Sequence, residues 1–181
     1  AHYVNAGTIE FLLESNEQFY FMEMNTRIQV EHPVTECVTG IDLIKEQIRI
    51  AAGKKLSYRQ QDVRIGGHAI ECRINAENPK EQFRPSPGLI TDVYFPGGKG
   101  VRIDTAVYNG YEVPAYYDSM LAKLIVYAKT RKEAISKMRS ALGEVIIEGV
   151  DTNVDYQYEI MNHPDYQAGN VDIEFISEKM C

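Results

Sequence analysis

Residues 7–25 read Gly-Thr-Ile-Glu-Phe-Leu-Leu-Glu-Ser-Asn-Glu-Gln-Phe-Tyr-Phe-Met-Glu-Met-Asn. Two runs rich in β-forming residues flank the polar stretch 15–18, and this order predicts a β-hairpin with a four-residue connection. With that connection, Glu14 faces Phe19 and Glu10 faces Glu23. The hairpin therefore decides which side chains meet in this part of the chain.

Side chains alternate between the two faces of a strand, so the predicted pairing sorts the hairpin into two faces. One face is expected to carry Thr8, Glu10, Leu12, Phe21, Glu23 and Asn25. The other, apolar face is expected to carry Ile9, Phe11, Leu13, Tyr20, Met22 and Met24.

Two carboxylates directly opposite each other destabilise a strand pair. At about 5 Å and an effective dielectric constant of about 20, the repulsion between Glu10 and Glu23 is roughly 3 kcal/mol. A divalent cation would offset it, because Mg²⁺ prefers oxygen ligands such as two carboxylates and an amide oxygen, completed by phosphates and water. The alternative is a solvated polar face on which the two acids turn apart. A connection one residue longer or shorter would shift the register, so that Glu10 and Glu23 would no longer lie directly opposite each other.

The stretch that follows the hairpin, residues 26–36, is predicted to be a polar loop because it contains Pro33. If it is extended, Arg27, Gln29 and Glu31 point the same way. A guanidinium fits a planar anion such as bicarbonate, and a carboxylate four residues later could act as a base on it. The alternative is a structural Arg–Glu pair on a loop, and His32 beside the proline is expected to be structural.

The composition of the whole chain is that of a folded globular protein, with 44% hydrophobic and 25% charged residues among 181. We see neither an apolar run long enough for a membrane helix nor a signal peptide. A net charge of −7 without a basic run argues against nucleic-acid binding, which depends on neutralising phosphates. Cys37, Cys72 and Cys181 are far apart and lack a Cys-x-x-Cys motif, which favours reduced thiols in a cytosol-like compartment over zinc or disulfides.

The remaining pattern predicts a helix, then short strands, then two helices. The first helix is capped by Thr39, has Asp42 at its third position and ends at Gly53. The predicted strands span residues 68–75, 89–95, 101–107 and 120–128, separated by turns rich in proline and glycine.

Of the two closing helices, one is capped by Thr130 and the other by Thr152, and the second runs through Met161. The apolar stripe of the first comprises Ala134, Ile135, Met138, Ala141, Leu142 and Val145. We therefore expect an α+β protein of two domains, 1–60 and 61–181, the second a mainly antiparallel sheet with helices.

A longer motif, residues 23–36, reads Glu-Met-Asn-Thr-Arg-Ile-Gln-Val-Glu-His-Pro-Val-Thr-Glu. Together with Glu10, it resembles the metal- and bicarbonate-binding segment of biotin carboxylases. The resemblance continues through Gly67–Glu77, Pro85–Gly88 and Tyr116–Met120 and covers essentially the whole chain. It implies that residues 1–60 are the C-terminal part of an ATP-grasp domain and that residues 61–181 are the biotin carboxylase C-terminal domain.

The family uses ATP and bicarbonate, through carboxyphosphate, to carboxylate biotin held on a carrier protein. The resemblance implies that Glu10 and Glu23, assisted by Asn25, bind Mg²⁺ or Mn²⁺ at the ATP phosphates. It also implies that Arg27, with Gln29 and the backbone of Val30, holds bicarbonate. Glu31 would then be the general base.

Further roles implied by the resemblance lie elsewhere in the chain. Arg73 would stabilise the negative charge that develops on the biotin ureido oxygen. Leu12 and Ile173 match apolar positions around the adenine, although such residues also occur in any sheet core. Arg102 matches a residue of a homodimer interface, but Lys99 nearby departs from a well-known bacterial pattern that has Phe.

The resemblance also implies partners and limits. The full-length enzyme would be cytoplasmic and would act with a biotin carboxyl carrier protein and carboxyltransferase subunits. The motifs resemble the bacterial acetyl-CoA carboxylase subunit, which serves fatty-acid synthesis, more than pyruvate carboxylase. The glycine-rich phosphate loop and the ATP-binding lysines of the family would lie upstream of residue 1, so the chain alone is expected to be inactive. The alternatives are the same module in a pyruvate or other acyl-CoA carboxylase, or a non-catalytic folding or oligomerisation module.

Overall fold

The structure is a computed structural model that describes residues 2–180. It divides into two compact units, Ala1–Gly66 and Gly67–Cys181. Helices and antiparallel strand pairs occur together in this mixed architecture, as the sequence predicts. Among the described residues, no helix has both the length and the apolar character needed to cross a membrane.

The smaller unit contains the predicted hairpin, formed by β1 (Thr8–Leu13) and β2 (Phe19–Asn25). Its register pairs Glu10 with Glu23, as predicted. The predicted Glu14–Phe19 pair is wrong, because Phe19 pairs with Leu13 and the connection has five residues, 14–18. A β-bulge at Met22 absorbs the extra residue, so the longer connection does not displace the two carboxylates.

Because of the bulge, the predicted faces of the hairpin are wrong for two residues. Phe21 pairs with Phe11, and Tyr20 pairs with Leu12, so Phe21 and Tyr20 exchange the faces expected for them. Phe11 contacts both Phe19 and Phe21 edge-to-face, with ring centroids 5.3 and 6.2 Å apart. These three aromatic rings therefore gather on the face opposite the carboxylates.

Two helices and one 3₁₀ turn complete the smaller unit, and the first helix was not predicted. Helix α1 (His32–Thr39) occupies part of the expected loop, because proline is tolerated in the first turn of a helix. Helix α2 (Leu43–Ala51) is capped by Asp42, which accepts from the Lys45 N–H, and not by Thr39. Gly53 follows the end of this helix with a positive φ of 73°, the conformation expected of a glycine that ends a helix. The 3₁₀ turn η1 spans Gln60–Asp62.

The larger unit is organised by a three-stranded sheet in the order β3-β10-β8. Strands β3 (His68–Asn75) and β10 (Met120–Ala128) have the predicted bounds. Strand β8 (Val101–Thr105) ends before the predicted limit, because the Thr105 hydroxyl accepts from the Val107 N–H and turns the chain.

Short antiparallel pairs form the other strands of the larger unit. They are β4 (Glu77–Asn78) with β5 (Arg84–Pro85), β6 (Gly88–Leu89) with β9 (Glu112–Val113), and β7 (Asp92–Tyr94) with β11 (Ile146–Glu148), and the 3₁₀ turn η2 (Pro79–Glu81) follows β4. The single strand predicted over residues 89–95 is thus two strands with different partners. The chain passes between them at Ile90, which is fully buried.

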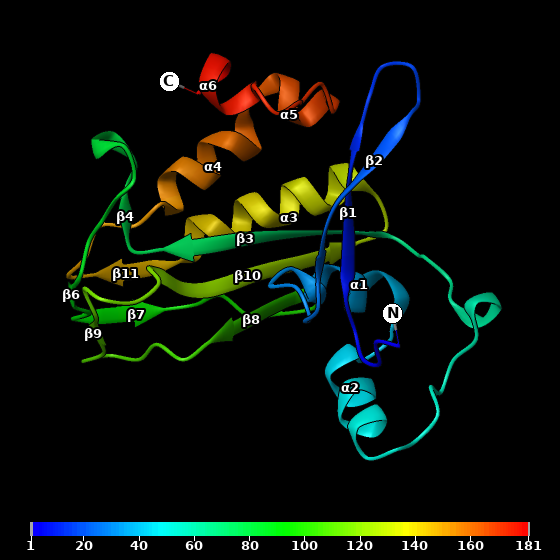
Figure 1. Ribbon diagram of the computed structural model, residues 1–181. Coiled ribbons are helices and arrows are strands. Elements are labelled where there is room, and N and C mark those ends of the chain that lie inside the picture. The colour runs from blue at the N-terminus through cyan, green and yellow to red at the C-terminus, as the bar shows by residue number, and fades with distance from the viewer. Residues whose placement is uncertain (1, 181) are drawn as a thin grey trace. The chain divides into compact units, whose positions relative to one another are not determined.

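Four helices follow the sheet along the chain: α3 (Arg131–Glu144), α4 (Val154–Asn162), α5 (Pro164–Ala168) and α6 (Phe175–Lys179). Helix α3 lies along β3 and β10, and α4 packs against α3 and also contacts β3 (Figure 1). The Thr130 side chain caps α3, as predicted, by accepting from the Glu133 N–H. The predicted cap of α4 is wrong by one residue, because Asn153 and not Thr152 is its N-cap.

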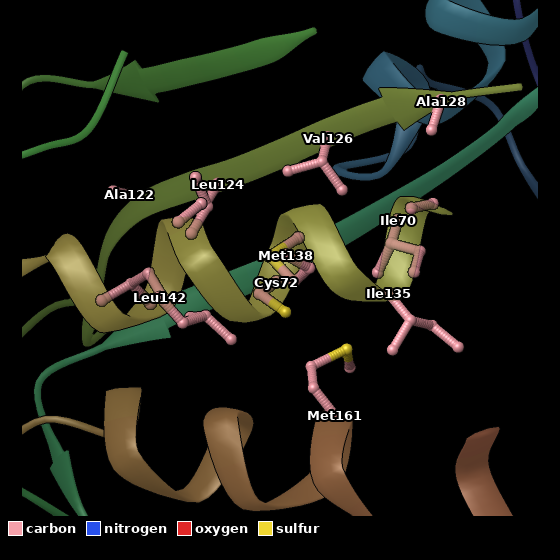
Figure 2. Close-up of a cluster of buried hydrophobic side chains, with 13 residues drawn as sticks. Ile70, Cys72, Ala122, Leu124, Val126, Ala128, Ile135, Met138, Leu142 and Met161 are labelled. Carbon is pink, nitrogen blue, oxygen red and sulfur yellow. The ribbon is translucent and has the colours of Figure 1, made fainter. Parts of the chain in front are cut away.

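The main core lies between α3 and one face of the sheet. The predicted α3 stripe is buried there except for Val145, which is partly buried against the cluster. Figure 2 shows Met138 and Leu142 of α3 beside Leu124 of β10 and Cys72 of β3. Burial, with a smaller effect of Glu71, raises the pKa of the Cys72 thiol to about 12, so this thiol stays protonated and unreactive. Cys37 forms no disulfide among the described residues, and Cys181 lies outside them.

The position of Met138 predicts a large loss of stability on truncation. Met138 is fully buried in the core. We expect Met138→Ala to lower the free energy of unfolding by about 2–5 kcal/mol, because it leaves a cavity that the packed core closes only in part. Urea unfolding followed by circular dichroism measures it. Met120→Ala, at the more exposed end of β10, is the control; equal losses in both variants would contradict this description of the core.

Candidate functional site

The pair of carboxylates in the hairpin is bridged by one amide group. Asn25 Nδ2 donates to Glu10 Oε1 at 2.8 Å and to Glu23 Oε1 at 3.1 Å. Hydrogen bonds to ionised acceptors are among the stronger ones in proteins. The amide therefore offsets part of the repulsion between the two acids and keeps them directed to one point instead of letting them turn apart.

The donor set at this point suits a hard divalent cation. Glu10 and Glu23 offer carboxylate oxygens, which Mg²⁺ prefers. Within residues 2–180, no three His, Cys, Asp or Glu side chains gather as candidate metal ligands. The two carboxylates can therefore hold a cation only together with other oxygens, such as those of phosphates, water or the Asn25 amide.

Asn25 also connects the carboxylates to the following segment. Its Oδ1 accepts from Arg27 Nη2 at 3.4 Å, while its Nδ2 faces the acids. Asn25 can become a metal ligand only if its amide turns over, because an amide N–H cannot bind a cation. Arg27 Nη1 donates to Gln29 Oε1 at 2.8 Å and to the Ile28 carbonyl at 3.2 Å.

Arg27, Gln29 and Glu31 line one cavity of about 490 Å³ in the smaller unit. The expectation of an extended segment is wrong at its end, because a turn at Val30 leads into α1 and makes Glu31 the N-cap residue. The turn nevertheless leaves all three side chains on the same cavity. Val30 itself lies in the turn and is not one of the lining residues.

His32 lines the same cavity, a position that the sequence pattern did not single out. Its Nδ1 lies 2.8 Å from the Gln29 carbonyl oxygen. A carbonyl can only accept, so this nitrogen carries the proton. The ring thus fixes the Gln29 backbone, in agreement with the structural role expected for this histidine.

Arg73 belongs to the larger unit and is exposed, as alternation along β3 predicts. In the sheet register it lies opposite Lys123, which in turn lies opposite Asp104. The two cations and the acid therefore form a row across the face of the sheet that points away from α3.

Asp104 is the centre of the charge pairing on this face. Arg102 donates to it through Nε at 2.7 Å and Nη2 at 2.9 Å, and Lys123 Nζ lies 3.5 Å from Oδ2. The hydrogen bond from Arg102 is the main cause that lowers the pKa of Asp104, and the charges of Arg102 and Lys123 add to it, while partial burial opposes them. Arg102 is therefore held in place by its own strand.

The two residues matched to adenine contacts are not core residues of their units. The Leu12 side chain on β1 is 60% exposed, and Ile173, in the turn before α6, is fully exposed. The assignment of both residues to the adenine stays a prediction. Leu12 belongs to the smaller unit and Ile173 to the larger one.

Comparison with known protein families gives two matches. Residues 71–178 match the biotin carboxylase C-terminal domain, and residues 1–59 match the ATP-binding domain of the carbamoyl-phosphate synthase L chain. The first match alone spans more than half of the chain. The chain belongs to the biotin carboxylase family.

Relatives in this family are similar over nearly the whole chain. Biotin carboxylase 1 of Bacillus subtilis is 57% identical over 96% of this chain, and a pyruvate carboxylase subunit of Methanothermobacter thermautotrophicus is 56% identical over 97%. The chain spans 39% and 36% of those proteins. The biotin carboxylase domain dimer of Hydrogenobacter thermophilus 2-oxoglutarate carboxylase, solved with MgADP, ADP and bicarbonate, is 50% identical with a TM-score of 0.92; the match covers 96% of this chain and 38% of that one.

The carboxylate pair predicts separate effects on metal binding and on stability. In the full-length protein, we expect Glu23→Gln to weaken Mg²⁺ binding in the presence of ADP, because one anionic ligand is lost. Without metal, stability should stay equal or rise slightly, because the repulsion with Glu10 is relieved. Calorimetric titration and urea unfolding measure the two effects.

The matched control is Glu17→Gln, which makes the same change in the exposed hairpin connection and should alter neither quantity. Glu23 would be a structural residue if its substitution lowered the metal-free stability by several kcal/mol and left Mg²⁺ affinity unchanged.

The lowered pKa of Asp104 predicts a pH-dependent contribution to stability. A carboxyl whose pKa is lowered by folding stabilises the fold above its ordinary pKa of about 4, and this contribution is lost as the pH falls through the folded-state value. We expect Asp104→Asn to cost about 1 kcal/mol at pH 7. Urea unfolding at pH 7 and pH 3 measures whether the deficit shrinks in acid.

Glu112→Gln, an exposed position in the same unit, is the control and should cause no deficit at either pH. A deficit of Asp104→Asn that stayed equal at both pH values would show that lost packing, and not the charge, is responsible.

Proposed function

We propose that this chain is part of an enzyme that carboxylates biotin on a carrier protein, with ATP and bicarbonate as substrates, in the first half-reaction of acetyl-CoA carboxylase. The observation that carries the proposal is the chain of contacts from Glu10 and Glu23 through Asn25 to Arg27, and from there to the cavity with Glu31. Two carboxylates that could hold a cation at phosphates, followed by a cavity lined by an arginine and a glutamate, suit a reaction between ATP and bicarbonate.

Glu10 and Glu23, with Asn25 after its amide turns over, would hold Mg²⁺ or Mn²⁺ at the ATP phosphates. The bound cation would neutralise phosphate charge and so favour transfer of the terminal phosphoryl group. The MgADP in the structure of the Hydrogenobacter thermophilus domain supports magnesium as the ion. The hydrogen bond from Asn25 serves to hold both acids near this point before the ion arrives.

Arg27 would bind bicarbonate through its planar guanidinium, with Gln29 and the Val30 backbone as further contacts. The existing bond from Arg27 Nη1 to Gln29 Oε1 holds the guanidinium at the cavity. Glu31 would accept the proton from the bicarbonate hydroxyl, so that the oxygen left behind can attack the phosphoryl group. The negative charge of Glu31 faces the same cavity as Arg27, which keeps the base close to the bound anion.

Arg73 would act on the second substrate. When biotin N1′ loses its proton, negative charge develops on the ureido oxygen, and a fixed guanidinium stabilises that charge more than it stabilises neutral biotin. Leu12 and Ile173 would contact the adenine of ATP, and their exposure in their own units leaves both side chains available for such a contact.

The wider setting is proposed on the same basis. The smaller domain, residues 1–60, would complete an ATP-grasp fold, and residues 61–181 would form the C-terminal domain. The enzyme would work in the cytoplasm with the biotin carboxyl carrier protein and carboxyltransferase subunits. It would form a homodimer that involves Arg102, whose position Asp104 fixes through two hydrogen bonds.

The final acyl acceptor has a second candidate. The relative named biotin carboxylase 1 and the relative named as part of a pyruvate carboxylase have almost the same identity to this chain, 57% and 56%. Assays of the full-length enzyme with its carboxyltransferase, using acetyl-CoA and pyruvate in parallel, decide between the two. If only pyruvate were carboxylated, the chain would belong to a pyruvate carboxylase and not to an acetyl-CoA carboxylase.

A non-catalytic folding or oligomerisation module is the other alternative, and Arg73 tests it. In the full-length enzyme, we expect Arg73→Ala to reduce biotin carboxylation by roughly 10²–10³-fold, because one fixed donor to an oxyanion is lost. The KM for ATP should stay near its original value. Steady-state assays of carboxybiotin formation and ATP consumption measure both quantities.

Arg84→Ala is the control, because Arg84 is an exposed arginine of the same unit in a surface ion pair with Glu81. Its carboxylation rate should stay within about twofold of the parent, since such pairs contribute little. If Arg73→Ala behaved like Arg84→Ala, Arg73 would be a surface residue of the sheet and not part of the site.

A further inference from the structure

Asn153 is a buried polar residue at the start of α4, with only 5% of its surface exposed. It occupies the N-cap position, where asparagine usually bonds to the N–H groups of the first helical turn. Its side chain makes no such bond here. The side chain is therefore used for something other than capping its own helix.

The side chain of Asn153 instead bonds to the backbone of β3 on both sides of Ile74. Oδ1 accepts from the Asn75 N–H at 2.9 Å, and Nδ2 donates to the Arg73 carbonyl at 3.0 Å. The Asn153 N–H adds a third bond, to the Asn75 carbonyl at 3.2 Å. Because the backbone N–H can only donate and the carbonyl can only accept, the orientation of the amide is fixed.

These three bonds satisfy backbone groups of β3 that a neighbouring strand would otherwise pair with. β3 is an edge strand, since the sheet order is β3-β10-β8. An edge strand normally leaves a row of N–H and C=O groups without strand partners. At Arg73 and Asn75, Asn153 holds that edge, while β10 holds the other edge through the Arg73–Lys123 and Ile74–Ala122 pairs.

We infer that Asn153 is a positioning residue for Arg73: it fixes the backbone from which the Arg73 guanidinium projects. The inference rests on the role proposed for Arg73 above. The Arg73 side chain is long and exposed, so its reach is defined only if its backbone cannot shift. A displacement of about 1 Å at a reacting group can reduce a rate by roughly 100-fold.

The test uses the full-length enzyme with Asn153→Ala. We expect biotin carboxylation to fall by about 10- to 100-fold. Bicarbonate-dependent ATP hydrolysis without biotin, and the KM for ATP, should stay within about twofold of the parent. A variant that loses both activities in parallel would show a general structural role and overturn the inference.

Asn109→Ala is the matched control, because Asn109 Oδ1 also accepts from a backbone N–H of a short strand, that of Val93 at 2.8 Å. It removes the same kind of bond in the same unit and should leave carboxylation unchanged. If Asn153→Ala does not fold, Asn153→Asp replaces it. This variant keeps the acceptor for the Asn75 N–H but loses the donor to the Arg73 carbonyl, and the same selective loss of carboxylation is expected.

A double substitution separates this inference from the role of Arg73 itself. If Asn153 acts through Arg73, adding Asn153→Ala to Arg73→Ala should lower carboxylation by less than about twofold further. An equal loss in both backgrounds would overturn the inference and leave the role of Arg73 standing. If Arg73→Ala alone left the rate unchanged, the proposed function of Arg73 would fail first, and the positioning role with it.

Discussion

The pairing of β10 with both β3 and β8 is the constraint on which the larger unit depends. Side chains alternate along β10, so Leu124 and its neighbours of like parity pack against α3 while Lys123 points to the opposite face. A slip of one residue would exchange the two faces. Because β3 is paired with β10 in this register, Arg73 must lie on the charged face beside Lys123. The packing of an apolar core thus decides where the proposed catalytic cation stands.

In the smaller unit, strand register likewise decides which side chains meet, and here it brings two like charges together. Glu10 and Glu23 are opposite each other in the ladder, an arrangement that a merely structural hairpin gains nothing from. The Asn25 amide donates to both acids through its nitrogen and accepts from Arg27 through its oxygen. The carboxylates and the cavity lined by Arg27 and Glu31 are therefore linked by side chains only two residues apart along the chain.

The sequence predicted the elements whose patterns are local and continuous. The bounds of β3 and β10 and the α3 stripe follow from alternation and helical spacing. Glu10 and Glu23 were paired correctly through two compensating errors, a connection one residue longer and a bulge at Met22. Helix α1 was missed because a proline suggested a loop. The bond of Asn153 to β3 spans 78 residues, so no local pattern could predict it.

We propose that Glu10 and Glu23 hold the cation at the ATP phosphates, beside the cavity that Arg27 and Glu31 line. A crystal structure of the full-length protein with Mn²⁺, ADP and bicarbonate tests this role, because manganese is located by its anomalous scattering. We predict one manganese peak in direct contact with an oxygen of each carboxylate, with bicarbonate on Arg27. A manganese peak away from both glutamates, with ADP bound, would show that these two residues do not bind the ion.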